Sequence, residues 1–348
     1  MIPDASQWAR LALLTGLGAA LAWALTHAVR RYALRADLLD RPNDRSSHTV
    51  PTPRGGGVAF VAAFLALSGA LWWQGLVDLP LFVALFCSSL LVAVIGFLDD
   101  RRPLPARVRF AGHTVAGAWV LWWLGPIPDV PAFGTAVPLG LIGYAIALAY
   151  LVWSINLFNF MDGIDGIAGI ELITVMAGGA LVWALAGVGS GWTAAILLAA
   201  CVAGFLVLNF PPARIFMGDA GSGFLGLLIA ALGLWCGRDR PMLFWSWFIL
   251  YGCFMVDATT TLVRRVRRGE VFHEAHRSHA YQYASRLCGS HRTVTLAVGL
   301  INLCWLLPWA VAVALGRIDG LLATVLAYAP LVALAFHFRA GDRRAQAT

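Results

Sequence analysis

Residues 79–102, LPLFVALFCSSLLVAVIGFLDDRR, join an uninterrupted apolar run to four consecutive charged residues. The apolar part has about the 20 residues that an α-helix needs to cross the hydrocarbon core of a bilayer. The charges that follow, Asp99 to Arg102, mark an edge of the membrane. The stretch therefore predicts a transmembrane helix over 79–98 with two adjacent carboxylates at its C-terminal end.

The composition indicates that this span is one of many. Of the 348 residues, 60% are hydrophobic and 12% are charged, whereas about a quarter of the residues in soluble domains are charged. Soluble and disordered classes are therefore excluded. We expect an all-α, polytopic integral membrane protein, with residues 1–348 in a single membrane-embedded domain. Apolar runs predict eleven spans near 9–29, 57–73, 79–98, 108–124, 138–155, 167–186, 192–209, 222–236, 242–263, 293–315 and 320–338.

The basic residues set the expected topology. All 25 are arginine, and most of them lie in loops on one side of the membrane if the N-terminus is outside. The positive-inside rule then predicts a cytoplasmic C-terminus and a multi-pass protein of the cell's inner membrane. A net charge of +7 could also indicate nucleic acid, but this placement argues for topology and phosphate binding, so we expect no nucleic-acid partner. The cytoplasmic loops, which we expect to form the active site, are 30–56, 99–107, 156–166, 210–221 and 264–292.

All five of these loops contain carboxylates, and in three of them the carboxylates lie in motifs that indicate a site. Asp99 and Asp100 repel each other and need a cation, which neighbouring arginines or a divalent metal such as Mg²⁺ could supply. In SINLFNFMDGIDGIAG (154–169), polar residues recur at every third position, so a helix would place neighbouring members on one face. Asp219, in NFPPARIFMGDAGSGFLG (209–226), either caps the following helix or holds a metal beside bound phosphate.

The loop RRVRRGEVFHEAHRSHAYQYASR (264–286) contains three histidines spaced by threes among arginines. Zinc is one alternative, but the arginines would repel a dication and favour phosphate oxygens. On the opposite side of the membrane, the proline-rich and glycine-rich stretch 125–137 predicts a turn or hairpin. Asp257 lies inside a predicted span, and we expect it to pair within the bundle without a further role.

In this order, these motifs resemble the polyprenyl-phosphate N-acetylhexosamine-1-phosphate transferases, of the glycosyltransferase family 4 type. That family includes phospho-N-acetylmuramoyl-pentapeptide transferase. The resemblance runs from about Asp40 to Gln282 and includes DRPNDRSSHTVPTPRGGG (40–57) in the first loop. The ending HRSHAYQ (276–282) is most similar to the branch that initiates O-antigen and other surface polysaccharides. Two departures stand out, because the family often has a lysine at Ser46 and further histidines at Tyr281 and Gln282.

The resemblance implies a Mg²⁺-dependent enzyme, with Mn²⁺ as an alternative ion. It would transfer an N-acetylated sugar-1-phosphate from a UDP-sugar to undecaprenyl phosphate and release UMP. The implied partners are the polyprenyl phosphate lipid, the UDP-N-acetyl sugar and the bilayer, and a homodimer is an open alternative to a monomer. The identity of the sugar stays open. The competing class is an ion-coupled transporter with carboxylate sites, which would place them near the middle of the bilayer on repeated halves.

The resemblance also implies roles for individual residues. The implied catalytic residues are Asp99, Asp100, Asp219 and His279. The implied metal ligands are Asn159, Asp219, Asp99 and Asp100. The implied substrate contacts are His48, Arg54, Asn159, Asp162, Asp165, Arg277 and His279.

Overall fold

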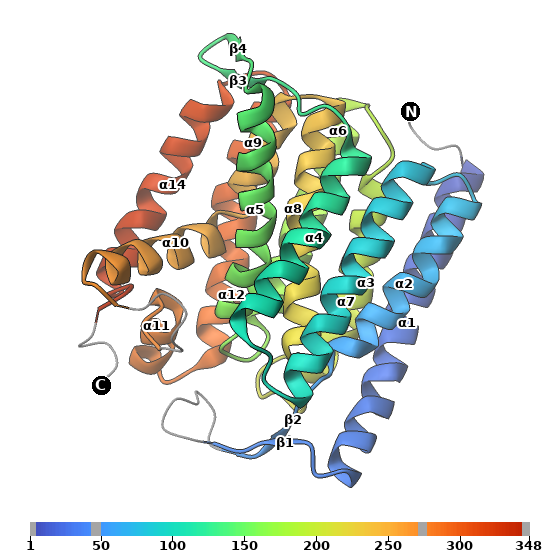
Figure 1. Cartoon of the computed structure of the whole chain (residues 1–348), viewed down its shortest axis with the longest axis vertical. Helices are drawn as coiled ribbons and strands as arrows, with labels where there is room; N and C mark the ends of the chain where they lie inside the picture. Colours follow the sequence, from blue (N-terminus) through green and yellow to red (C-terminus); the bar gives the residue numbers. More distant parts are fainter. Residues whose placement is uncertain (1–4, 43–49, 271–276, 343–348) are drawn as a thin grey trace.

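Helices account for almost all of the secondary structure in the computed structural model, which describes residues 5–42, 50–270 and 277–342 (Figure 1). The helices are α1 (Ala5–Arg35), α2 (Gly57–Trp73), α3 (Leu79–Arg101), α4 (Ala106–Leu124), α5 (Gly140–Met161), α6 (Ile167–Ala186), α7 (Trp192–Asn209), α8 (Asp219–Asp239), α9 (Met242–Leu250), α10 (Gly252–Arg267), α11 (Ala280–Cys288), α12 (His291–Ile301), α13 (Leu307–Ala314) and α14 (Gly320–His337). A π-helical turn, η1 (Asn302–Leu306), joins α12 to α13. The predicted all-α class is confirmed.

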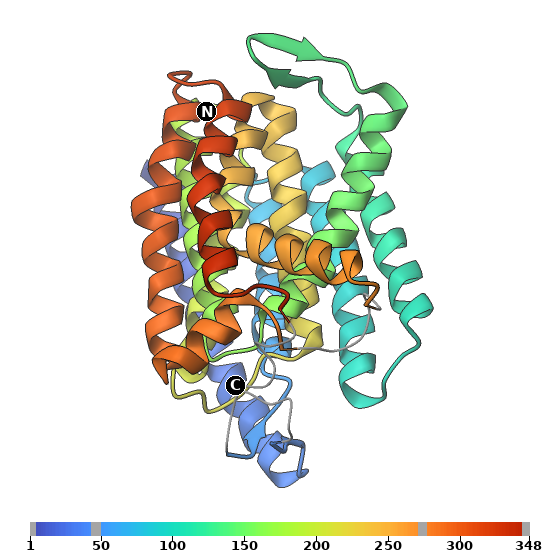
Figure 2. The same cartoon turned by 90° about the vertical axis from the view of Figure 1, so that its left-hand side faces the viewer.

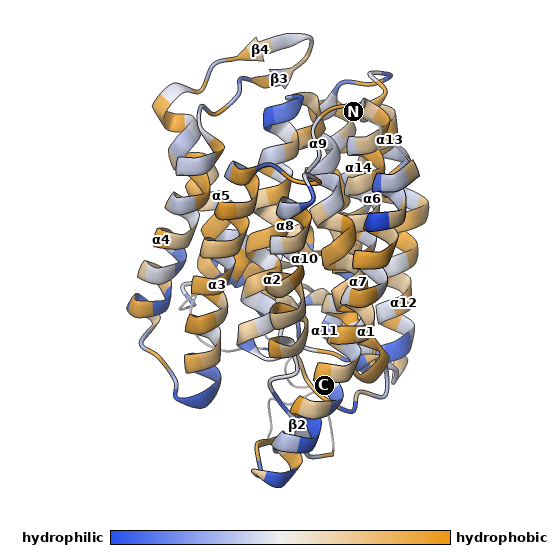
Figure 3. Ribbon diagram, turned by 90° about the vertical axis from the view of Figure 1, so that its right-hand side faces the viewer, coloured by the Kyte–Doolittle hydropathy of each residue, from blue (hydrophilic) through white to orange (hydrophobic). Residues whose placement is uncertain are grey.

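Each predicted span falls on helical structure. Within the described ranges, eight helices are long and apolar enough to cross a membrane, or nine if the bent pair α9 and α10 counts as one span. Helix α2 is shorter, with 17 residues, and α4 carries Arg107, Arg109 and His113. Figure 3 shows apolar residues along the helices and hydrophilic residues gathered near the ends of the bundle. The protein is therefore a polytopic membrane protein, and the number eleven stays a prediction.

Helix α8 forms the centre of the bundle. All residues of its apolar window are buried, and α2, α3 and α5 pack around it (Figure 1). Glycines permit these close contacts: a Cβ on Gly57 would lie 2.6 Å from Cα of Gly221, and a Cβ on Gly226 would lie 2.3 Å from the carbonyl oxygen of Ser154. The N-terminal end of α8 is therefore held tightly between its neighbours.

The predicted span 242–263 is not one straight helix. It breaks at Tyr251 into α9 and α10, which differ in direction by 74°. A Cβ on Gly252 would lie 2.7 Å from the Tyr328 ring, so glycine allows α14 to pack closely at the break. Helix α10 consequently lies across the bundle (Figures 1 and 2).

The loop boundaries also differ from those predicted. Helices α1, α3 and α5 continue to Arg35, Arg101 and Met161, so each extends past its predicted apolar run. The predicted loop 264–292 contains the end of α10, the whole of α11 and the start of α12. The end of an apolar run indicates where the hydrocarbon core ends. The helices continue past that point because polar residues can also form the backbone hydrogen bonds of a helix.

Two antiparallel ribbons complete the fold. Strands β3 (Val130–Ala132) and β4 (Thr135–Val137) form the predicted hairpin, while β1 (Leu39–Asp40) and β2 (Thr52–Pro53) pair within the first loop. Helix α1 begins at one end of the bundle and α14 finishes at the other (Figure 1). This agrees with an odd number of crossings, and the assignment of the second end to the cytoplasm stays a prediction from the arginine distribution.

Candidate active site

The end of α3 and the beginning of α8 meet at one end of the bundle, and this contact brings three carboxylates together. A Cβ on Gly96 would lie 2.4 Å from the carbonyl oxygen of Asp219, so only glycine lets α8 approach α3 this closely. Asp99 and Asp100 follow Gly96 by about one helical turn. They therefore lie beside Asp219, the first residue of α8.

Asp100 binds the amino end of α8. Its Oδ1 accepts a hydrogen bond from the amide of Asp219 at 3.0 Å, and its Oδ2 accepts one from the amide of Ala220 at 3.2 Å. These amides have no partner within their own helix, and the helix dipole favours a negative charge at this end. Gly218 has φ +79°, and a Cβ there would lie 2.7 Å from Asp100. The glycine before Asp219 is thus required for this contact.

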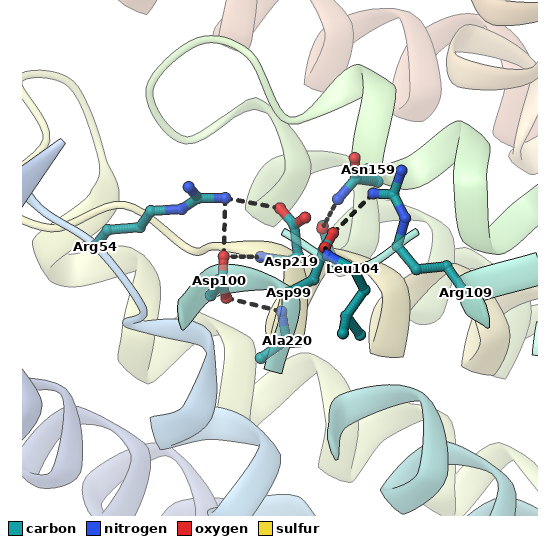
Figure 4. A network of polar contacts seen from close by, with 9 residues as sticks. Arg54, Asp99, Asp100, Leu104, Arg109, Asn159, Asp219 and Ala220 are labelled. Atoms are coloured by element: carbon teal, nitrogen blue, oxygen red, sulfur yellow. Dashed lines mark hydrogen bonds and ion pairs between the residues drawn. The ribbon is translucent and has the colours of Figure 1, made fainter. Parts of the chain in front are cut away.

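Arg54 provides a positive charge shared by two of the carboxylates. Its Nη2 lies 2.8 Å from Oδ1 of Asp100 and 2.9 Å from Oδ1 of Asp219, as Figure 4 shows. The first loop is held in place by backbone pairing, because the amide of Phe216 donates to the carbonyl of Pro53 at 2.8 Å and the amide of Gly56 donates to that of Phe216 at 2.8 Å. Two loops distant in sequence thereby fix the position of Arg54.

Asp99 faces the opposite direction from Asp100 (Figure 4). Its Oδ2 lies 2.7 Å from Nη1 of Arg109, and its Oδ1 accepts from the amide of Leu104 at 2.6 Å. Only 7% of its side chain is exposed. The adjacent carboxylates therefore do not share one partner: each is neutralised by a different arginine.

The asparagine-aspartate motif is divided between a helix and a loop. Asn159, in the last turn of α5, donates to the hydroxyl of Ser222 on α8 at 3.0 Å. Asp162 is the C-cap residue that directly follows α5. Burial raises the pKa of the Asp162 carboxyl well above its ordinary value, and the nearby carboxylate of Asp219 raises it further. Asn159 and Asp162 thus belong with the α3–α8 carboxylates.

Asp165 has a different environment, so the expectation of one helical face is wrong at this position. Its Oδ2 accepts from the amide of Ala213 at 2.9 Å, and its Oδ1 lies 3.3 Å from Nδ1 of His291. Its carbonyl oxygen accepts from the hydroxyl of Thr295 at 2.8 Å. The helix ends at Met161, and Asp165 then joins the loop before α6 to the start of α12.

The histidine loop approaches the same end of the bundle through α11. His279 precedes α11, is 3% exposed and has its Nδ1 3.3 Å from Oδ1 of Asp257. The hydroxyl of Tyr281 donates to the carbonyl of Phe160 at 3.1 Å, which joins α11 to the end of α5. The carbonyl of Arg277 accepts from Arg286 at 3.4 Å. The implied contact His48, together with His273 and His276, lies outside the described residues.

A cavity of about 820 Å³ opens beside the carboxylates, between α3, α4, α5 and α8. At one end it is lined by Asp99, Arg109, His113, Asn159 and Asp219. Its other walls are largely apolar and are contributed by Phe110, Ala145, Leu148, Ala149, Val152, Trp153 and Leu262. The cavity thus joins a charged end to a long apolar wall, the arrangement that suits an amphipathic ligand.

Sequence reasoning missed two groups in this region. Arg109 is one of the arginines that predict only the topology, yet it neutralises Asp99, and its place one helical turn before His113 is the sequence signal of a polar face on α4. Asp257 was given no role, although it contacts His279. A lone carboxylate inside an apolar span is the signal that could have identified it. Over residues 5–42, 50–270 and 277–342, no three His, Cys, Asp or Glu side chains form a group that could hold a metal ion.

Comparison with known proteins relates the chain to membrane transferases. The sequence model of glycosyl transferase family 4 matches residues 82–237. A probable undecaprenyl-phosphate N-acetylglucosaminyl 1-phosphate transferase of Bacillus subtilis is 30% identical over 293 residues, which cover 80% of this chain and 78% of that protein. The decaprenyl-phosphate N-acetylglucosaminephosphotransferase of Mycobacterium tuberculosis strain H37Rv is 32% identical, over 82% of this chain and 79% of its own.

A third relative has a different sugar in its name. The phospho-N-acetylmuramoyl-pentapeptide-transferase of Moorella thermoacetica is 36% identical over 218 residues, 58% of this chain and 67% of that protein. The family match, residues 82–237, includes the positions of Asp99, Asp100, Asn159 and Asp219.

Proposed function

The chain belongs to glycosyl transferase family 4, and from this we propose that it is a polyprenyl-phosphate sugar-1-phosphate transferase. In finer detail, it transfers an N-acetylated sugar-1-phosphate from a UDP-sugar to undecaprenyl phosphate and releases UMP. The relatives named after N-acetylglucosamine support an N-acetylhexosamine donor. This would be the first membrane step in making O-antigen or another surface polysaccharide.

The observation that carries the proposal is the apolar cavity with carboxylates and Arg109 at one end. A polyprenyl phosphate has a long apolar chain and a charged head, so both parts find matching surroundings there. The charged end lies at the helix termini, where α3 finishes and α8 begins. The arginine-rich loops support a cytoplasmic location for this end. A nucleotide sugar arriving from the cytosol would then reach the same end.

No three His, Cys, Asp or Glu side chains of the described residues form a preformed metal site, but the donor atoms at the charged end are of the types that a hard divalent cation prefers. Asp219 and Asn159 offer carboxylate and amide oxygens, which Mg²⁺ and Mn²⁺ prefer. One cationic nitrogen of Arg54 lies between Asp100 and Asp219, so a positive charge at this point stabilises both carboxylates. Asp219 and Asn159 would hold the ion, with Asp99 and Asp100 adding negative charge. When bound, Mg²⁺ would polarise the phosphorus under attack and stabilise the UMP leaving group.

The chain's own residues have separate tasks in this mechanism. An oxygen of the polyprenyl phosphate attacks the sugar-bearing phosphorus of the UDP-sugar. A new P–O bond forms as the P–O bond to UMP breaks, and UMP leaves with the bonding electrons. Asp99, at the cavity wall, keeps the acceptor phosphate deprotonated, while Arg277 and His279 neutralise charge on the transferred group. The alternative is a covalent phosphoryl-aspartate at Asp99, which divides the transfer into two displacements.

The test is an assay of the purified protein in lipid nanodiscs with undecaprenyl phosphate, Mg²⁺ and a panel of UDP-sugars. We expect UMP release that requires the lipid, together with one sugar-linked lipid product that identifies the donor. Inclusion of UDP-glucose beside the N-acetylated sugars tests the requirement for the acetamido group.

The outcome that contradicts the proposal is an absence of lipid-dependent UMP release with every donor. Ion uptake into proteoliposomes would then favour the transporter alternative. The position of the carboxylates at helix ends, and not midway along the spans, already argues against that alternative.

A further inference from the structure

Asp257 is a buried carboxylate on α10 that binds a different helix. It is 7% exposed, its Oδ1 accepts from the amide of Ala280 at 3.0 Å, and its Oδ2 accepts from the amide of Tyr281 at 3.0 Å. These are the first two residues of α11. The first amides of a helix lack partners within it and lie at the positive end of its dipole. Asp257 therefore fixes where α11 begins.

The same carboxylate contacts the residue before α11. Nδ1 of His279 lies 3.3 Å from Oδ1 of Asp257, and the ring is almost fully buried. A carboxylate on one ring nitrogen fixes the orientation of an imidazole. His279 is held a second time by its own helix, because its amide donates to the side-chain oxygen of Gln282 at 3.3 Å.

Helix α11 in turn contacts the loop that carries Asp162. The hydroxyl of Tyr281 donates to the carbonyl of Phe160, and a Cβ on Gly163 would lie 2.1 Å from that hydroxyl. A shift of α11 would therefore displace both His279 and the end of α5. Thr261, one turn further along α10, donates to Oδ1 of Asp257 at 3.2 Å. Both residues belong to α10, so this hydrogen bond does not join α10 to α11.

We infer that Asp257 is a positioning residue for sugar-1-phosphate transfer, which acts by orienting His279 at the start of α11. The inference rests on the proposed function, since it takes the role of His279 from there. It differs from simple stabilisation of the bundle, because it requires the effect of Asp257 on turnover to pass through His279.

A double-mutant cycle tests this requirement. Asp257→Asn keeps the shape of the side chain but removes its charge and one acceptor oxygen. We expect kcat for UMP release to fall about 10- to 100-fold, as for other hydrogen-bond partners that orient an active-site histidine. In a His279→Ala background, Asp257→Asn should lower kcat less than about twofold further. Thr261→Val, which removes a contact to the same oxygen, serves as the matched control and should keep at least about half of wild-type turnover.

Two results of the cycle overturn the inference. One is full activity of Asp257→Asn. The other is a double variant whose fold loss in kcat equals the product of the fold losses of Asp257→Asn and His279→Ala.

Hydrogen exchange measured by mass spectrometry gives a second readout, independent of turnover. The amides at the start of α11 should exchange faster in Asp257→Asn than in the wild type or in Thr261→Val. Unchanged exchange would overturn the anchoring of α11 by Asp257. If the wild-type protein releases no UMP with any donor, the proposed function fails, while the exchange experiment still decides whether Asp257 holds α11.

Discussion

Arg54 and Asp219 lie 165 residues apart in the sequence, yet the guanidinium Nη2 of Arg54 is 2.9 Å from Oδ1 of Asp219. This ion pair joins the loop before α2 to the first residue of α8. Arg54 also binds Asp100 at the end of α3, so three separate segments meet at one guanidinium. The pair is partly exposed, with 42% of the Arg54 side chain accessible, and remains within reach of a ligand.

Asp219→Asn and Asp99→Asn should each lower UMP release about 100-fold or more, because each removes a charge from the site of phosphoryl transfer. Both substitutions preserve side-chain volume, so the protein should still insert into membranes and elute as a single species in detergent. Asp129→Asn, in the loop at the opposite end of the bundle, is the matched control and should leave turnover unchanged. Normal turnover by purified Asp219→Asn or Asp99→Asn would contradict the assignment of that residue.

Gly96→Ala should separate α3 from α8, since the new Cβ would lie 2.4 Å from the backbone of Asp219. We expect a loss of about 1–3 kcal/mol in stability, as for other overpacked contacts, together with a fall in UMP release. Thermal unfolding in detergent and the UMP assay measure the two effects. Gly69→Ala, in α2 with open space around it, is the control and should slightly raise the unfolding temperature. Equal behaviour of the two variants would show that the α3–α8 contact is not tight.

Ala149→Trp should fill part of the apolar cavity, which Ala149 lines on α5. We expect the KM for undecaprenyl phosphate to rise about tenfold or more, because pocket shape discriminates among apolar ligands. The KM for the UDP-sugar should stay the same. Leu141→Trp, on the same helix but 86% exposed and outside the cavity lining, is the matched control. An equal change in both KM values would argue against this cavity as the acceptor site.

Removal of divalent metal with EDTA should abolish UMP release, and Mg²⁺ or Mn²⁺ should restore it.

Asp162→Asn and Asp165→Asn then separate two roles within one motif. The charge of Asp219 acts on the Asp162 carboxyl, so substitution of Asp162 should shift the Mg²⁺ concentration needed for half-maximal activity. Asp165 binds His291 and the amide of Ala213, so its substitution should chiefly lower the unfolding temperature. A larger Mg²⁺ shift in Asp165→Asn would reverse these assignments.

The sequence by itself determined the class of protein and the positions of its apolar helices. Apolar runs such as 79–98 fall on helices because hydropathy and helix length are local properties, readable one segment at a time. The motifs around Asp99, Asn159 and Asp219 indicated the family for the same reason, since each is a short continuous stretch. The hairpin within 125–137 was predictable because proline and glycine limit the backbone locally.

Only the tertiary structure decided how these segments meet. The break at Tyr251 carries no charge or proline, and it depends on the packing of α14 against Gly252. Asp99 and Asp100 are neighbours in sequence, yet they bind Arg109 and Arg54 respectively. Asp165 follows Asp162 by three residues but faces His291, because the helix has already ended. Such pairings depend on distances between segments far apart in the chain, which no local pattern of residues encodes.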